Sequence, residues 1–312
     1  MAAQRILSLL PAATEMVFLL GAGERLVGRS HECDFPDAAH GIPIVSRTRI
    51  DPSQGSARID AAVKESLSQN QALFSLDTAR IREMKPDLIL TQGQCAVCAI
   101  DSSELDQLLD TWTGPRPEVL SLSPARIKDL WTDLRQVAQA LGVPDEGRSV
   151  IGALKGRMVD VIQRVGASEE RPTVACLEWL DPLMGAGNWI PELVELAGGT
   201  PVLGKAGVHS EWITWEELVA ADPEVVVALP CGFDLHRTLL ELAPLRTRPE
   251  WSRLQAVQRR RAFAADGNAY FNRPGPRLID SLELLAELIH PLPEPRRRFQ
   301  GTGWHAVEQA DL

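Results

Sequence analysis

The sequence predicts an α/β protein made of two Rossmann-like lobes joined by a long connecting helix. Short apolar runs typical of strands alternate with amphipathic helical segments in both halves of the chain. Between the halves, residues 146–165 keep a helical periodicity with no strand signal beside them. The chain has 312 residues, more than one ordinary hydrophobic core accommodates, so two lobes are expected.

In the first half, a strand over 5–10 is followed by a helix over 15–20. Thr14 is the expected N-cap of this helix, and the glycines of residues 21–23 end it. The same alternation of strands and helices then continues. Further strands are expected at 26–28, 42–46, 72–75, 88–90 and 119–122, and further helices at 57–68, 77–84 and 124–141.

The pattern restarts after a polar boundary at residues 166–172. Strands are expected at 173–177, 225–228 and 262–264, helices at 191–196, 215–220 and 277–289, and a long loop at 178–190. The segment after residue 290 is rich in proline and arginine, so a loosely held tail is expected there. The predicted organisation is an N-terminal lobe (1–143), a connecting helix (144–168), a C-terminal lobe (169–290) and a tail (291–312).

The two halves carry matching segments in the same order. Glu15-Met-Val is followed by glycine at position 21, and Glu192-Leu-Val by glycine at position 198, at the same spacing. Lys85-Pro-Asp-Leu-Ile-Leu likewise matches Asp222-Pro-Glu-Val-Val-Val. These matches favour two lobes of related topology. The loops that follow the strands of both lobes are then expected to line one cleft, because open α/β sheets bind ligands at the carboxyl ends of their strands.

Composition and charge exclude some functions. The chain is 45% hydrophobic and 24% charged, with a formal net charge of −10 and no basic face, which argues against binding of nucleic acid or anionic membranes. The apolar run after Arg5 is too short for a secretory signal, and no run is long enough to cross a bilayer. The sequence therefore predicts a cytoplasmic protein without membrane insertion, and its five cysteines are expected to be reduced thiols.

Four cysteines fall in the expected strand-end loops. Cys95 and Cys98 have the spacing of a tetrahedral metal knuckle, and His31 with Cys33 supplies a possible second pair of ligands. Cys231 follows the corresponding strand of the second half. Zinc or an iron–sulfur cluster would suit such thiols. The alternative is that small buried residues simply fill tight loops.

Other residues of these loops are candidates for binding a planar, metal-bearing ligand. His31 suits an axial position on cobalt or iron, and Glu32 suits the amide groups of a ligand. Flat aromatic walls with a few polar anchors suit a macrocycle. The expected ligand-binding set is Pro11, Ala12, Thr14, His31, Glu32, Gln92, Trp179, Trp189, Tyr270 and Asn272. A hydrogen-bonded loop histidine and aromatic residues that only pack remain the alternatives.

Three segments and a glycine pair carry a resemblance to a known family. They are Arg5-Ile-Leu-Ser-Leu-Leu-Pro-Ala-Ala-Thr-Glu15, Leu26-Val-Gly-Arg-Ser-His-Glu-Cys-Asp34, Lys85-Pro-Asp-Leu-Ile-Leu90 and Gly198-Gly199. With them the chain resembles the cobalamin- and ferric-siderophore-binding proteins of ABC importers, and most closely the cobalamin-binding branch. The resemblance implies a rigid hinge helix, little lobe closure and a metal-bearing ligand held between the lobes. Members of that family are usually periplasmic or lipid-anchored and deliver their ligand to a permease.

The leading functional hypothesis is non-catalytic binding of a metal-containing tetrapyrrole, namely cobalamin or another corrinoid. The alternative is a cytoplasmic metal- or thiol-dependent enzyme, or a protein that handles a corrinoid or metal chelate, using the Cys-x-x-Cys and His-x-Cys loops. A third hypothesis is a subunit whose lobes dock on an ABC transporter permease.

Overall fold

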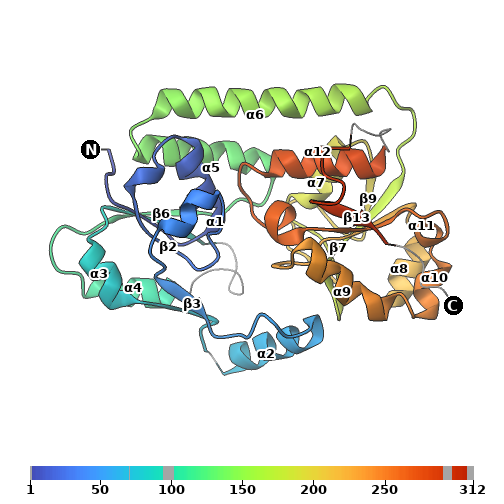
Figure 1. The fold of residues 1–312 in the computed structure, drawn as a ribbon, viewed down its shortest axis with the longest axis horizontal. Coiled ribbons are helices and arrows are strands. Elements are labelled where there is room, and N and C mark those ends of the chain that lie inside the picture. The colour runs from blue at the N-terminus through green and yellow to red at the C-terminus, as the bar shows by residue number, and fades with distance from the viewer. Residues whose placement is uncertain (1, 70, 94–101, 291–296, 308–312) are drawn as a thin grey trace. The chain divides into compact units, whose positions relative to one another are not determined.

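The structure is a computed structural model that describes residues 2–69, 71–93, 102–290 and 297–307. The chain divides into two compact units (Figure 1). The N-terminal unit contains residues 1–54, 58–124 and 128–153, and the C-terminal unit contains residues 55–57, 125–127 and 154–312. In the described residues, no helix combines the length and the apolar composition that a membrane span requires.

The N-terminal unit is built on a four-stranded parallel sheet in the order β2-β1-β5-β6. Its strands are β1 (Ile6–Ser8), β2 (Leu26–Arg29), β5 (Leu88–Gln92) and β6 (Glu118–Leu122). A separate antiparallel pair is formed by β3 (Ser46–Thr48) and β4 (Phe74–Leu76). The helices that begin in this half of the sequence are α1 (Pro11–Leu19), α2 (Ser56–Ser68), α3 (Thr78–Met84), α4 (Ser102–Asp110) and α5 (Ile127–Ala140).

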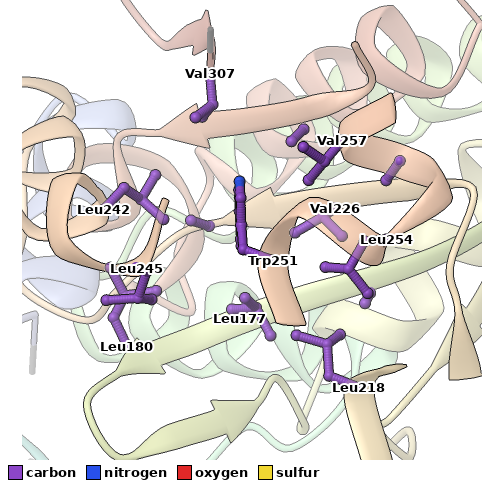
Figure 2. Close-up of a cluster of buried hydrophobic side chains, with 14 of the residues drawn as sticks. Leu177, Leu180, Leu218, Val226, Leu242, Leu245, Trp251, Leu254, Val257 and Val307 are labelled. Atoms are coloured by element: carbon purple, nitrogen blue, oxygen red, sulfur yellow. The ribbon is translucent and has the colours of Figure 1, made fainter. Parts of the chain in front are cut away.

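The C-terminal unit is built on a seven-stranded sheet in the order β10-β8-β7-β11-β12-β13, with β9 also paired to β7. Its strands are β7 (Thr173–Leu180), β8 (Leu183–Gly185), β9 (Thr200–Val202), β10 (Glu211–Trp212), β11 (Val225–Ala228), β12 (Ala262–Ala265) and β13 (Trp304–Ala306). Its helices are α7 (Ile190–Leu196), α8 (Trp215–Ala221), α9 (Leu235–Leu245), α10 (Pro249–Arg253), α11 (Gln255–Gln258) and α12 (Leu278–Ile289). Figure 2 shows Trp251 in the middle of the core of this unit, with Leu242 and Leu245 on one side and Val226 and Leu254 on the other.

The predicted internal repeat is confirmed by the topology. Strands β2-β1-β5-β6 of the first unit and β9-β7-β11-β12 of the second are parallel and follow the same spatial order. In both units a glycine with positive φ follows the first helix, Gly21 at +74° and Gly198 at +83°. Each unit is therefore one copy of the same α/β arrangement.

The repeated proline junction has the same geometry in both units. The residue before the proline, Lys85 or Asp222, is left-handed and ends the preceding helix. The carboxylate after the proline then accepts backbone hydrogen bonds at the start of the neighbouring strand. Asp87 accepts from Arg5 at 3.0 Å, and Glu224 accepts from Thr173 at 3.0 Å. The junction therefore aligns the first strand of each unit with its neighbour.

The connecting helix is α6 (Pro144–Val165), the longest helix of the described chain, and the boundary between the two units falls within it, after residue 153. Its buried apolar residues recur at helical spacing at Ile151, Leu154, Val161 and Val165.

Several element boundaries differ from the expectation. Helix α1 starts at Pro11 rather than Glu15, because proline is favoured in the first helical turn and Leu10 occupies the N-cap without a side-chain bond. Thr14 lies inside the helix, and its hydroxyl donates to Ser8 Oγ at 2.8 Å. The strand expected at 42–46 begins only at its last residue, and Ile44 makes an isolated bridge to Arg29.

The expected loop after β7 contains further structure. Strand β7 continues to Leu180, turns at Asp181–Pro182 and returns as β8, which pairs antiparallel with it. Helix α9 was not expected, although Asp234 caps it by accepting a hydrogen bond from the backbone of Arg237 at 2.8 Å.

The sequence predicted a loosely held tail, but the described part of this C-terminal segment is firmly attached. Strand β13 pairs antiparallel with β12 and forms an edge of the sheet. The buried carboxylate of Glu287, on α12, accepts hydrogen bonds from the backbone of Arg298 at 2.7 Å and from Trp304 Nε1 at 3.1 Å. These bonds fix the segment to the C-terminal unit.

Candidate functional site

The most developed polar cluster of the N-terminal unit surrounds His31, just after β2. Ser46 Oγ lies 2.7 Å from His31 Nδ1 and also accepts a hydrogen bond from the backbone N–H of His31 at 3.1 Å. The Ser46 side chain is buried and its hydroxyl donates to Ser30 Oγ at 3.1 Å. Two contacts to one buried hydroxyl fix the orientation of the imidazole ring.

The opposite edge of the His31 ring is not hydrogen-bonded in the described part of the chain. Nε2 lies 3.2 Å from Glu32 Oε1 but without hydrogen-bond geometry, and the ring lies 5.6 Å from that of Phe74. The side chain of Glu32 is 48% exposed, whereas that of His31 is 18% exposed. An imidazole held through Nδ1 with Nε2 otherwise unbound is the arrangement in which histidine ligates metals.

The residues around the start of α1 are mostly enclosed. Thr14 and Ala12 are buried, and Ser8 Oγ donates to the Leu10 carbonyl at 3.1 Å. Pro11 keeps part of its surface exposed, as does Gln92 at the end of β5. Of these four predicted ligand-binding residues, Pro11 and Gln92 are accessible and Ala12 and Thr14 support the turn.

In the C-terminal unit, a tryptophan near the end of β7 stacks with aromatic and cationic side chains that follow β11. The rings of Trp179 and Phe233 lie 5.3 Å apart, and the guanidinium of Arg237 lies 3.8 Å from the Phe233 ring. Trp179 is only 9% exposed, and its Nε1 is buried without a hydrogen-bond partner in the described residues. Trp179 therefore forms the inner layer of this wall.

Trp189 and Asn272 join the loops that follow β11 and β12. The indole of Trp189 donates to the carbonyl of Phe271 at 2.8 Å. The amide of Asn272 donates to the carbonyls of Leu229 and Gly267, both at 3.0 Å. A Cβ on Gly267 would lie 2.2 Å from the Pro230 carbonyl, so only glycine permits this approach. The predicted residues Trp189 and Asn272 thus hold the loops in place.

The π-helical turn Gly267–Phe271 carries further polar groups. Burial raises the pKa of the Asp266 carboxyl, which accepts a hydrogen bond from Ala269 N at 2.7 Å. Burial also raises the pKa of the Tyr270 phenol, whose ring meets Phe299 edge-on at 5.6 Å. Arg273 is buried and donates to Asn268 Oδ1 at 2.9 Å.

The cysteines do not form a metal centre in the described residues. No three His, Cys, Asp or Glu side chains come together there as a cation site. Cys33 is fully buried with its Sγ 4.0 Å from the Ser8 carbonyl, whereas Cys231 is partly exposed. Cys95 and Cys98 lie outside the described residues. Burial raises the pKa of Cys176 to about 12, so this thiol is inert.

Four residues of these clusters were not predicted. Ser46 was assigned only as the end of a strand, and Arg273 lies in a Pro- and Gly-rich loop without a motif. Phe233 and Arg237 flank the cap of α9, and the Asp234 N-cap was the available signal for that helix.

Comparison with known proteins identifies the family. The model of the periplasmic binding proteins matches residues 6–269. The chain is 21% identical over 296 residues to an ABC transporter substrate-binding lipoprotein of Bacillus subtilis, covering 92% of this chain and 80% of that protein. It is 20% identical over 295 residues to a vitamin B12-binding protein of Yersinia pestis, covering 94% of this chain and 89% of that protein.

Solved structures share the fold. A periplasmic haem-binding protein from Pseudomonas aeruginosa superposes with a TM-score of 0.72 at 22% identity, covering 98% of both chains. The periplasmic vitamin B12-binding protein of Vibrio cholerae gives a TM-score of 0.66 at 20% identity, covering 92% of this chain and 96% of that one. Since the family model covers most of the chain and the repeated α/β units agree with it, this protein belongs to the periplasmic binding protein family.

Proposed function

We propose that this protein binds a metal-containing tetrapyrrole, cobalamin or another corrinoid, as the substrate-binding component of an ABC importer. Family membership supports a binding role without covalent chemistry. The similar proteins include one named for binding vitamin B12 and one named for binding haem. Both of these ligands consist of a planar macrocycle around a metal.

The observation that carries the proposal is the geometry of His31. Ser46 holds Nδ1, and in the described part of the chain Nε2 is buried without a hydrogen-bond partner, 3.2 Å from Glu32 Oε1. In the proposal, the exposed Glu32 side chain turns aside and Nε2 takes the open axial position of cobalt. Neutral imidazole is a suitable ligand for cobalt and iron. The Glu32 carboxylate then accepts hydrogen bonds from amide groups at the edge of the corrin ring.

The C-terminal unit contributes flat area and positive charge. The stack of Trp179, Phe233 and Arg237 supports a macrocycle at its edge, and Tyr270 adds a partly exposed aromatic side chain. Trp189 and Asn272 keep the loops of this wall in register. In the N-terminal unit, Pro11 and Gln92 are the accessible members of the proposed contact set besides His31 and Glu32.

The proposal is tested by titrating the purified full chain with aquocobalamin while recording tryptophan fluorescence and the visible spectrum. We expect saturable quenching together with a shift of the cobalamin bands, because imidazole replaces the water on cobalt. His31→Ala should remove the band shift and lower the affinity at least tenfold. His209→Ala is the matched control, since His209 is an exposed loop histidine.

Haem provides the second arm of the experiment. Saturable binding of haem without binding of cobalamin would overturn the corrinoid assignment but keep the class of metal tetrapyrrole. Failure to bind either compound, or a band shift that survives in His31→Ala, would contradict the proposed axial role.

Location and partner follow from the same role. The expected cytoplasmic location has no support among the similar proteins, whose names include a lipoprotein and periplasmic proteins. We therefore propose that the protein works at the cell envelope with an ABC permease. Cell fractionation with an antibody to the protein tests the location, and co-purification with a permease tests the partnership. Recovery in the cytoplasmic fraction alone would contradict this part of the proposal.

A further inference from the structure

A cavity of about 150 Å³ opens on the C-terminal unit between α9 and the edge strand β13. Helix α9 and the residue after it contribute Leu239, Leu242 and Arg246, and the C-terminal strand contributes His305, Ala306 and Val307. Leu242 and Val307 belong to the core cluster of Figure 2, so the cavity has an apolar floor.

The cavity lies near the amino ends of the parallel strands, whereas the candidate ligand loops follow their carboxyl ends. Helix α9 begins at the cap Asp234, after the carboxyl end of β11, and runs away from that edge to Leu245. Val307 N–H donates to the carbonyl of Ala262, the first residue of β12. Because β12 is parallel to β11, this contact marks the amino edge of the sheet. The cavity is therefore separate from the proposed tetrapyrrole loops of the same unit.

Arg246 gives the cavity its chemical character. Its Nε is buried, and in the described part of the chain it has no hydrogen-bond partner. A buried donor without an acceptor is unfavourable, and more so in a charged group. The side chain of Arg246 lines the cavity, and a carboxylate there fits the planar guanidinium with hydrogen bonds from its terminal nitrogens.

We propose that this cavity binds a small monocarboxylate with an apolar body. The carboxylate pairs with Arg246, and the apolar body covers Leu239, Leu242 and Val307. An apolar cavity of about 150 Å³ is known to hold a benzene-sized molecule, which sets the size of the body. Charge complementarity selects the carboxylate over a neutral compound of the same shape.

The test uses the full chain and benzoate as the probe, with benzyl alcohol as the neutral compound of the same shape. Saturation-transfer NMR and calorimetric titration at neutral pH should give saturable benzoate binding, with benzyl alcohol at least tenfold weaker. Arg246→Gln should lower the affinity for benzoate at least tenfold. Arg248→Gln is the matched control, because the Arg248 guanidinium lies 4.7 Å from the Trp215 ring and does not line the cavity.

A second variant keeps the test decisive if Arg246→Gln does not fold. Ala306→Leu places a larger side chain at the cavity wall and should abolish benzoate binding while leaving the aquocobalamin titration unchanged. Equal binding of benzyl alcohol, unchanged benzoate binding in both variants, or displacement of benzoate by aquocobalamin would overturn the proposal. Because the cobalamin titration is read separately, failure of this site is distinguishable from failure of the proposed function.

Discussion

At the scale of single residues, Asp133 on α5 is a buried and poorly compensated carboxylate of the N-terminal unit. Its side chain is 6% exposed, and Oδ2 accepts no hydrogen bond from any described residue. Burial, followed by the nearby charge of Asp129, raises the pKa of Asp133 to about 6. The folded state thus holds this proton more tightly than the unfolded chain does. The cost of ionising Asp133 appears as the pH rises from about 4 to about 6.

Asp133→Asn should therefore stabilise the protein at neutral pH. The pKa shift of Asp133, from 3.8 to about 6, corresponds to a gain of at most ~3 kcal/mol in the free energy of unfolding at pH 7. The gain should shrink strongly near pH 4, where the carboxyl is protonated in the folded state and about half protonated in the unfolded chain. Urea unfolding at pH 4 and pH 7 measures it. The exposed Asp106→Asn is the control, expected within about 0.5 kcal/mol of wild type at both pH values.

Which site residues the sequence could reveal depends on how they are held. His31 and Glu32 were predicted because they directly follow a strand, and strand ends are visible in the apolar pattern. Ser46, which orients the imidazole, lies fifteen residues further along the chain, and only the folded chain brings them together. Trp179 and Trp189 were predicted as flat surfaces, but sequence could not show that both are largely buried, because that depends on Phe233 and Phe271.

At the scale of elements, α6 contains two glycines at which a side chain would have open space. A Cβ on Gly152 or Gly156 would meet no atom within 4 Å. Glycine inside a helix costs about 0.5–1 kcal/mol relative to alanine. Gly152→Ala and Gly156→Ala should each raise the free energy of unfolding by about that amount, as measured in urea.

Gly185 in β8 is the contrasting position. A Cβ there would lie within 2 Å of the backbone oxygen of Leu203, and a backbone atom cannot move aside easily. We expect Gly185→Ala to lower the unfolding midpoint strongly. Equal effects of the helix and strand substitutions would contradict the packing described for β8.

Strand β13 depends on one buried carboxylate of α12. Glu287 accepts from the backbone of Arg298 and Phe299 and from the Trp304 indole. Glu287→Ala leaves these donors without their acceptor, so we expect a loss of about 2–4 kcal/mol in unfolding free energy. Trp304, now 4% exposed, should become accessible to acrylamide. Glu283→Ala is the control: its ion pairs with Arg157 and Arg298 are more exposed, so Trp304 should stay protected.

The elements that the sequence predicted are those with a strong local pattern. Strand β11 matches the expected residues, and α3 starts just after its Asp77 cap. Strands β8, β9, β10 and β13 were missed because these short segments lack a local apolar pattern and are defined by their partners in the sheet. Helix α1 starts earlier in the chain than predicted, because proline at position 11 is as well suited to the first helical turn as to a loop.

At the scale of the whole molecule, the internal repeat was the strongest inference from sequence. Two short matches predicted two related units, and the strand orders of both sheets agree. The ligand was not predictable to the same degree, because the fold is shared by proteins named for haem and for vitamin B12. The identity of the ligand depends on a few loop side chains, and these have no fixed spacing in sequence.

The charge of the whole chain gives a further prediction. With a formal net charge of −10, the protein should pass through a heparin column at pH 7.5 and bind an anion exchanger. It should also cause no gel shift of double-stranded DNA at low salt. Retention on heparin that is released by salt would reveal a basic surface and contradict the exclusion of nucleic-acid partners.

The antiparallel strand β13 has a consequence for solubility. It covers β12, whose four residues Ala262–Ala265 are all buried, at an edge that would otherwise expose a row of backbone donors and acceptors. Uncovered apolar edge strands pair with other chains and start aggregation, and very short edge strands limit this risk. We therefore expect the segment at 297–307 to protect β12 from intermolecular β-pairing through the three residue pairs that β13 makes with it.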